Sequence, residues 1–262
     1  MQYVKSLVND NSITFVCEHW LRPHELHLVE SIDFSSEWTY LKSSIDPTQQ
    51  LLGRPFGGCG FICKQLDGIV YKPVACKSDR FCVIEVISGP RKVLTLIGVY
   101  LPYDDNSLLS YETYLNVVHE IQGFIDNCDS PCMLLGDFNT RLPQVPSLSN
   151  KWYKRRPFTK RSVLLYDFIC DNQLYVANFS FNQKVNYTFS NSVARSYIDH
   201  ILVPEYLQEN MIECTILDAC ADNTSDHLAI KCSLKLFVNH PKNPEQYELS
   251  LCSKVPRPEW DS

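Results

Sequence analysis

The sequence predicts an α/β fold in which two β-sheets pack face to face and helices cover their outer faces. Many short apolar or alternating runs are typical of strands, and only a few stretches have helical periodicity. The length of 262 residues is enough for one large domain with a substantial core. A composition of 45% hydrophobic and 21% charged residues is that of a globular rather than a disordered protein.

The expected elements follow from hydrophobic periodicity, taken in order. Helices are predicted where apolar residues recur every three or four positions, over residues 2–9, 108–126 and 162–170. Apolar or alternating runs predict strands over 13–17, 59–64, 69–72, 80–88, 93–100, 132–135, 174–177, 185–189, 197–203, 212–217 and 228–237. After this last strand the chain is polar and contains several prolines. Residues 1–238 are therefore predicted to form the domain, and residues 239–262 a tail or linker.

Charge and composition limit the possible functions. The net charge of −6 provides no global positive field, so nucleic-acid binding would need a local basic patch. The sequence has no apolar run long enough for a membrane span and no signal peptide. The 12 cysteines are therefore expected to be reduced thiols in an intracellular protein.

The stretch after the predicted strand 132–135 carries the first functional signal. Gly136 ends the apolar run, and Asp137 and Asn139 follow it. In extended backbone these two side chains project to the same side, where they could hold a water or a phosphate. A turn in which Asp and Asn bond to nearby backbone explains the same residues. From this stretch alone the two interpretations have equal weight.

Polar residues also lie at the ends of four other predicted strands. They are Glu18, Tyr100, Asp199 and the run Ser225-Asp226-His227. Each of them, taken alone, is more often structural than functional. Together they supply oxygen ligands for magnesium, a histidine that can be charged near neutral pH, and an aspartate to orient it. Their joint occurrence favours an active site.

The order of these motifs resembles the endonuclease/exonuclease/phosphatase superfamily, which includes the DNase I-like and apurinic/apyrimidinic endonucleases. The resemblance rests on Glu18, Tyr100-Leu101-Pro102, Gly136-Asp137-Phe138-Asn139, Arg195-Ser196-Tyr197-Ile198-Asp199 and Ser225-Asp226-His227. The stretches 16–21, 57–61, 187–189 and 258–261 are most similar to the endonuclease domain of non-LTR (LINE-type) retrotransposons, in which this domain is fused to a reverse transcriptase. The resemblance implies a four-layered α/β sandwich of two mostly antiparallel sheets with helices outside.

The resemblance also implies a reaction, the metal-assisted hydrolysis of DNA phosphodiester bonds by in-line attack of water. Mg²⁺ is the implied cofactor, with Mn²⁺ as an alternative. Glu18 would bind the metal and Asp226 would support the metal side. Asp137 would orient and deprotonate the attacking water, and Asn139 would hold that water or the phosphate.

The remaining implied roles concern the phosphate. His227 would donate to the phosphate oxygens in the transition state, and Asp199 would hold the imidazole in its working tautomer. Tyr100 would contact the phosphate. A retrotransposon-type nicking enzyme of this kind would act on DNA in the nucleus.

A local basic run lies in the loop after Asn139. It combines positive charges with aromatic rings, which suits contacts with phosphates and bases. A solvated charge run explains the same composition, but its place beside the expected active site favours DNA binding. The residues expected to bind DNA are Lys151, Trp152, Lys154, Arg155, Arg156, Lys160 and Arg161, together with Arg195.

One departure from the family pattern bears on activity. The family begins with a strand that ends in an Asn, and here Met1 is followed directly by the helix predicted over 2–9. The N-terminal strand is therefore expected to be missing, which would leave one sheet short of a strand and could impair catalysis. Two alternatives to an active endonuclease follow: an inactive nucleic-acid-binding remnant, and a phosphatase of the same fold. Against the phosphatase, residues 195–202 lack the Trp-Cys-Asp-Arg run of the inositol-phosphate type.

Overall fold

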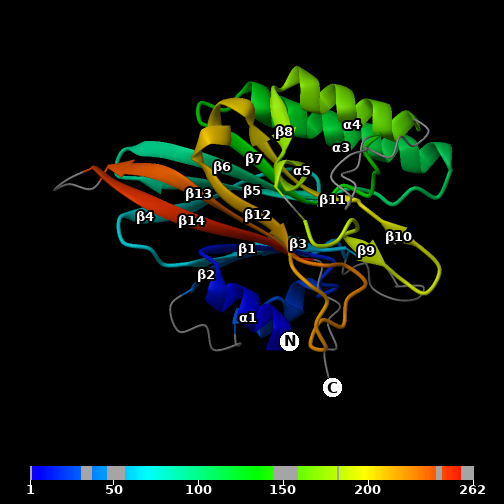
Figure 1. The fold of residues 1–262 in the computed structure, drawn as a ribbon, viewed down its shortest axis with the longest axis horizontal. Helices are drawn as coiled ribbons and strands as arrows, with labels where there is room; N and C mark the ends of the chain where they lie inside the picture. Colours follow the sequence, from blue (N-terminus) through cyan, green and yellow to red (C-terminus); the bar gives the residue numbers. More distant parts are fainter. Residues whose placement is uncertain are drawn as a thin grey trace.

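The computed structural model describes residues 2–30, 37–45, 57–143, 159–181, 183–239 and 244–254. Two sheets of six strands each pack face to face, with helices on the two outer faces (Figure 1). The predicted four-layered α/β sandwich is therefore confirmed. Within the described ranges, no helix is both long and apolar enough to cross a membrane.

The first sheet has the strand order β12-β13-β14-β1-β3-β2. All neighbours are antiparallel except β14 and β1, which are parallel. The strands are β1 (Ile13–Cys17), β2 (Glu37–Lys42), β3 (Cys59–Lys64), β12 (Met211–Ile216), β13 (Ile230–Asn239) and β14 (Pro244–Lys254).

The second sheet has the order β4-β5-β6-β7-β11-β8. Only β6 and β7 are parallel, and helix α3 makes the crossover between them. The strands are β4 (Ile69–Val74), β5 (Phe81–Ser88), β6 (Arg91–Tyr100), β7 (Cys132–Asp137), β8 (Leu174–Val176) and β11 (Asp199–Pro204). Two short strands, β9 (Phe189–Ser190) and β10 (Arg195–Ser196), pair with each other as a separate ribbon.

The helices form the outer layers. In Figure 1, α3 (Leu108–Asp126) and α4 (Lys160–Asp171) cover the second sheet, and α1 (Gln2–Asp10) lies against the first. Ser107 and Thr159 cap α3 and α4 by accepting hydrogen bonds from backbone N–H groups of the first turn. The shorter helical segments are η1 (Pro23–Glu25), α2 (His27–Glu30), α5 (Ala177–Ser180) and η2 (Glu205–Asn210). The three predicted helices are confirmed, and α3 has the predicted bounds.

The main core lies between the two sheets. Apolar side chains from both inner faces are fully buried there, among them Phe15, Phe61, Leu96 and Met133. Gly98 on β6 makes room for this packing, because a Cβ atom at this position would lie 2.1 Å from the Phe15 ring. A second cluster fills the space between the second sheet and the helices α3 and α4.

The structure corrects the prediction for the end of the chain. A tail or linker was expected from residue 239, but residues 244–254 form β14 in the middle of the first sheet. β14 pairs with β13 on one side and β1 on the other, from Ile13↔Leu251 to Val16↔Lys254. The expectation of a sheet that lacks a neighbour is also wrong, since β1 is paired along both edges. β2 was not predicted, and the strand expected over 185–189 is limited to Phe189–Ser190.

Candidate functional site

The two sheets bring most of the predicted site residues to one end of the sandwich. Tyr100, Asp137 and Asp199 occupy paired positions on three neighbouring strands, β6, β7 and β11. From the other sheet, Glu18 directly follows β1, and His227 lies three residues before β13. A cavity of about 720 Å³ opens at this end, and Glu18, Tyr100, Asp137, Asn139 and His227 are among its lining residues.

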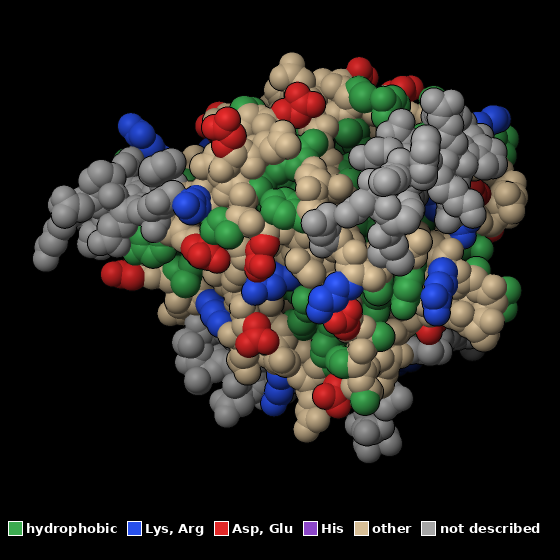
Figure 2. Space-filling model, viewed as in Figure 1, with side chains coloured by type: hydrophobic (Ala, Val, Ile, Leu, Met, Phe, Trp, Pro, Cys, Tyr) green, Lys and Arg blue, Asp and Glu red, His purple; other side chains and the backbone are tan. Residues whose placement is uncertain are grey.

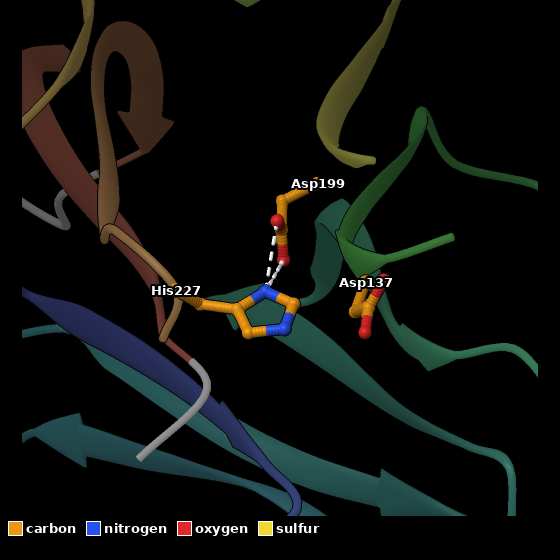
Figure 3. Close-up of side chains that lie close together, drawn as sticks. All are labelled: Asp137, Asp199 and His227. Carbon is orange, nitrogen blue, oxygen red and sulfur yellow. Dashed lines mark hydrogen bonds and ion pairs between the residues drawn. The ribbon is translucent and has the colours of Figure 1, made fainter. Parts of the chain in front are cut away.

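His227 and Asp199 form a buried ion pair. The Nδ1–H of His227 donates to both carboxylate oxygens of Asp199, at 3.1 and 3.0 Å. Burial alone would lower the pKa of His227, but the charge and hydrogen bond of Asp199 outweigh this and raise it to about 9. In Figure 3 the other ring nitrogen, Nε2, points to the side where Asp137 lies. The imidazole is therefore held in one orientation and is charged at neutral pH.

Asp137 and Asn139 are locked together at the end of β7. The Asp137 carboxylate accepts hydrogen bonds from the Asn139 backbone N–H at 2.8 Å and from its Nδ2 at 3.1 Å. Nδ2 also donates to the carbonyl of Leu101, so both amide hydrogens are used within the protein. The Asn139 Oδ1 is then an acceptor, which suits a water rather than a phosphate oxygen. Burial and the nearby Asp199 raise the pKa of Asp137 well above its usual value, which makes the carboxylate a stronger base.

Glu18 approaches from the opposite sheet. Its carboxylate accepts a hydrogen bond from the hydroxyl of Tyr100, which is itself 7% exposed. Burial, followed by the charge of Glu18, raises the pKa of Tyr100, so the phenol remains a donor. Glu18 and Asn139 have φ angles of 58° and 47°, in the left-handed region that residues other than glycine seldom adopt. Such backbone strain is concentrated at functional sites.

The residues at this end could hold a divalent cation. Asp137, Asp199 and His227 offer ligand atoms that all lie within 4.8 Å of one another, and Glu18 lines the same cavity as Asp137. Because His227 is already paired with Asp199, the oxygen atoms of Glu18 and Asp137 are the better donors. Carboxylate oxygens are the ligands that Mg²⁺ and Mn²⁺ prefer. The structure does not bring Asp226 into this group, because its side chain is exposed and does not line the cavity.

The residues predicted to bind DNA lie in different environments, and some lie outside the described residues. Five of them (Lys151, Trp152, Lys154, Arg155 and Arg156) lie outside the described residues. Lys160 and Arg195 are exposed, and each lies over a tyrosine ring. Arg161 is 2% exposed and donates to the carbonyl of Pro102, so its predicted contact with DNA is not supported. On the face drawn in Figure 2, basic and acidic side chains are interspersed rather than gathered in one basic patch.

Two residues that sequence reasoning missed support the site. The Thr188 hydroxyl accepts from the backbone N–H of Asp199 at 3.0 Å, and the Thr188 carbonyl accepts from the residue after His227. Lys254, at the end of β14, is 1% exposed, and its Nζ donates to the carbonyl of His227 at 2.5 Å and to Asn223 Oδ1 at 2.7 Å. Burial lowers the pKa of Lys254 to about 8, although the charge of Asp199 opposes this shift. Only the fold brings these residues together.

Solved structures of other proteins share this fold. The 3′ phosphatase NExo from Neisseria, solved with a product DNA hairpin, matches with a TM-score of 0.64 at 14% identity, over 89% of this chain and 93% of that one. The endonuclease domain of TRAS1, a telomere-specific non-LTR retrotransposon, matches with a TM-score of 0.57 at 12% identity, over 87% of each chain. At these identities the likeness shows the fold.

Sequence comparison identifies the family. No curated protein matches the chain. The family model described as endonuclease-reverse transcriptase matches residues 94–231, just over half of the chain's 262 residues. This match includes the motifs around Tyr100, Asp137, Asp199 and His227. The chain therefore belongs to the endonuclease/exonuclease/phosphatase superfamily and, within it, to the endonuclease-reverse transcriptase family.

Proposed function

We propose that this protein is a divalent-metal-dependent endonuclease that hydrolyses DNA phosphodiester bonds and nicks one strand, as retrotransposon endonucleases do. The observation that carries the proposal is the charged His227–Asp199 pair beside the Asp137–Asn139 pair in one cavity. The match to the endonuclease-reverse transcriptase family supports the same substrate class. The described residues thus provide an acid (His227), a base (Asp137) and a residue that positions the attacking water (Asn139).

The geometry gives each of these residues a step in the reaction. The Asn139 Oδ1 accepts a hydrogen bond from the attacking water, and the Asp137 carboxylate takes a proton from it as the new P–O bond forms. The bond from phosphorus to the leaving oxygen breaks in line with the attack, and this oxygen takes a proton from solvent water, which leaves one phosphate end and one hydroxyl end. His227 Nε2–H donates to a phosphate oxygen while Asp199 holds Nδ1. Glu18 and Asp137 would hold the divalent cation, which supplies positive charge to the phosphate.

Nicking of a supercoiled plasmid tests this proposal. The purified protein with Mg²⁺ should convert the plasmid to its relaxed form, and His227→Ala and Asp137→Ala should each lower the rate by about 10²–10³. His119→Ala is the matched control, because His119 is exposed on the outer helix α3 and should leave the rate unchanged. Equal inactivity of the wild type and both variants would support the non-enzymatic remnant instead.

Activity on DNA ends is a second candidate, because the structural neighbour NExo from Neisseria is a 3′ phosphatase and a 3′-5′ exonuclease. A DNA hairpin that carries a 3′ phosphate separates the two activities. An endonuclease nicks a closed circular plasmid, which has no ends. An enzyme restricted to ends releases phosphate or nucleotides from the hairpin and leaves the plasmid supercoiled.

The metal can be tested without measuring activity. Because a ligand that binds only the folded state stabilises it, Mg²⁺ or Mn²⁺ should raise the Tm of the wild type. Glu18→Gln removes the charge of one proposed ligand and should abolish this increase. If the Tm of Glu18→Gln rises as much as that of the wild type, Glu18 does not bind the cation.

A further inference from the structure

Two cysteines lie together at the end of β7 that is opposite the catalytic residues. Cys132 is the first residue of this strand, whose last residue is Asp137, and Cys128 lies in the turn between α3 and β7. Both are free thiols, and their side chains are hydrogen-bonded to each other. The two sulfur atoms are therefore neighbours, as the formation of a disulfide requires.

Cys128 is surrounded by groups that favour its thiolate form. Its sulfur lies 3.2 Å from the Thr95 hydroxyl and 3.5 Å from the Ser130 hydroxyl, and these two hydroxyls are 2.7 Å apart. Burial raises the pKa of Cys128, but the hydrogen bonds with Ser130, Thr95 and the Cys132 thiol outweigh burial, so the pKa is lowered. Because the thiolate is the nucleophilic form of cysteine, Cys128 is the more reactive member of the pair.

Cys132 has the opposite character. It is 7% exposed, and its sulfur lies 3.6 Å from the carbonyl oxygen of Ser130. Burial, followed by the hydrogen bond with Cys128, raises the pKa of Cys132, so this group stays a protonated thiol. A buried thiol reacts slowly with a dissolved oxidant, but it can react with a neighbouring sulfur that has already been oxidised. The two cysteines therefore suit two successive steps.

A cavity gives a small oxidant access to Cys128. This cavity of about 730 Å³ lies between the second sheet and α3, away from the catalytic cavity. Cys128 is half-buried and lines it together with Thr95, whereas Cys132 is not among its lining residues. A dissolved oxidant therefore meets the sulfur of Cys128 first, and Cys132 lies behind it.

We propose that Cys128 and Cys132 form a redox-active dithiol that hydrogen peroxide converts to a disulfide. The Cys128 thiolate attacks one peroxide oxygen, the O–O bond breaks, and the leaving hydroxide takes a proton and departs as water, so Cys128 becomes a sulfenic acid. The Cys132 sulfur then attacks the Cys128 sulfur, the S–O bond breaks, and the hydroxyl leaves with the Cys132 proton as a second water. The peroxide thus accepts two electrons from the two sulfurs. The dithiol uses none of the catalytic residues, so the inference does not depend on the proposed function.

Peptide mapping of the oxidised full chain tests this assignment. Residues 93–141 contain no Lys or Arg before Arg141, so trypsin releases both cysteines in one peptide that has no other cysteine. The reduced protein is treated with a small molar excess of hydrogen peroxide, and the remaining thiols are then alkylated with iodoacetamide in denaturant. The peptide 93–141 should lose both alkylation sites and carry an internal disulfide, which dithiothreitol should reverse. The exposed Cys170 and Cys220 should still be alkylated.

Two variants separate the roles of the pair, and a third is the matched control. Cys132→Ser should stop at the sulfenic acid, so dimedone should label Cys128, whereas Cys128→Ser should form no disulfide and leave Cys132 unlabelled. Cys170→Ser removes an exposed thiol on α4 and should form the disulfide as the wild type does. The inference is wrong if peptide 93–141 of the wild type stays fully alkylated while Cys170 or Cys220 is oxidised. Dimedone labelling of Cys132 in Cys128→Ser would contradict the assigned order of attack.

Discussion

The pairing of His227 with Asp199 makes a quantitative prediction for the Asp199→Asn variant. The ordinary pKa of a histidine is about 6.5, and in the wild type that of His227 is raised to about 9. A difference of this size corresponds to about 3 kcal/mol in favour of the charged imidazole. The Asp199→Asn substitution removes the carboxylate charge, and burial should then bring the pKa of His227 to about 6.5 or below.

The consequence for activity follows from the charged fraction of His227. At pH 7.5 a group with a pKa of 9 is roughly 97% protonated, whereas one with a pKa of 6.5 is roughly 10% protonated. Nicking by Asp199→Asn at pH 7.5 should therefore fall at least about tenfold. The alkaline limb of its rate profile should move from near pH 9 to near or below pH 6.5.

The assay is the plasmid nicking rate between pH 5 and 10, combined with an NMR titration of the His227 ring protons. Asp222→Asn is the control, since Asp222 is exposed and should leave the profile unchanged. Stability provides an independent check. Because folding raises the pKa of His227, the pair stabilises the wild type fully below pH 6.5 and loses this contribution as the pH rises through 9. An alkaline limb that stays near pH 9 in the variant would refute the assigned role of the Asp199 carboxylate.

Three further predictions concern the core, the support of the site and the metal. Gly98→Ala should lower the free energy of unfolding, measured in urea, by about 1–3 kcal/mol, because the new Cβ would clash with the Phe15 ring. A Cβ at Gly123 would meet open space, so Gly123→Ala should not destabilise the protein. Lys254→Met removes the hydrogen bond to the His227 carbonyl and should lower kcat about tenfold with KM within twofold. Lys235 is exposed on β13, so Lys235→Met should leave both constants unchanged. A change in KM alone would contradict a role of Lys254 in positioning His227. A chelator should abolish nicking, and added Mn²⁺ should restore it.

The sequence allowed most of the site to be predicted because its residues lie at strand ends. In an α/β sandwich these ends meet at one edge, so an ordered set of polar residues that follow apolar runs predicts a shared location. Asp137, Asp199 and His227 come together in this way. The supporting role of Lys254 could not be predicted, since its contact with His227 depends on the strand order, which local patterns do not contain.

The strand β14 was missed although part of its signal is visible. Tyr247, Leu249 and Leu251 alternate with polar residues, which is the pattern of a strand with one buried face. The flanking prolines and charges are typical of a tail, and the prediction of a tail gave them more weight than this alternation. The alternation of apolar and polar residues therefore predicts this strand better than the local composition does. A segment with many polar residues is stable as a strand here because its neighbours β1 and β13 provide its backbone hydrogen-bond partners.

The position of β14 has a consequence for the order in which the protein can fold. Its pairing with β1 joins segments that are 238 residues apart, as the hydrogen bond from Ser12 to Ser250 shows. During synthesis β1 leaves the ribosome before β14 and cannot complete the first sheet until residue 254 has followed. Pairing between such distant segments is slow, so the edge of β1 that faces β14 remains unpaired while the residues between the two strands are made, whereas its other edge can pair earlier with β3. The catalytic end, which needs both β1 and Lys254, is then among the last parts of the molecule to assemble.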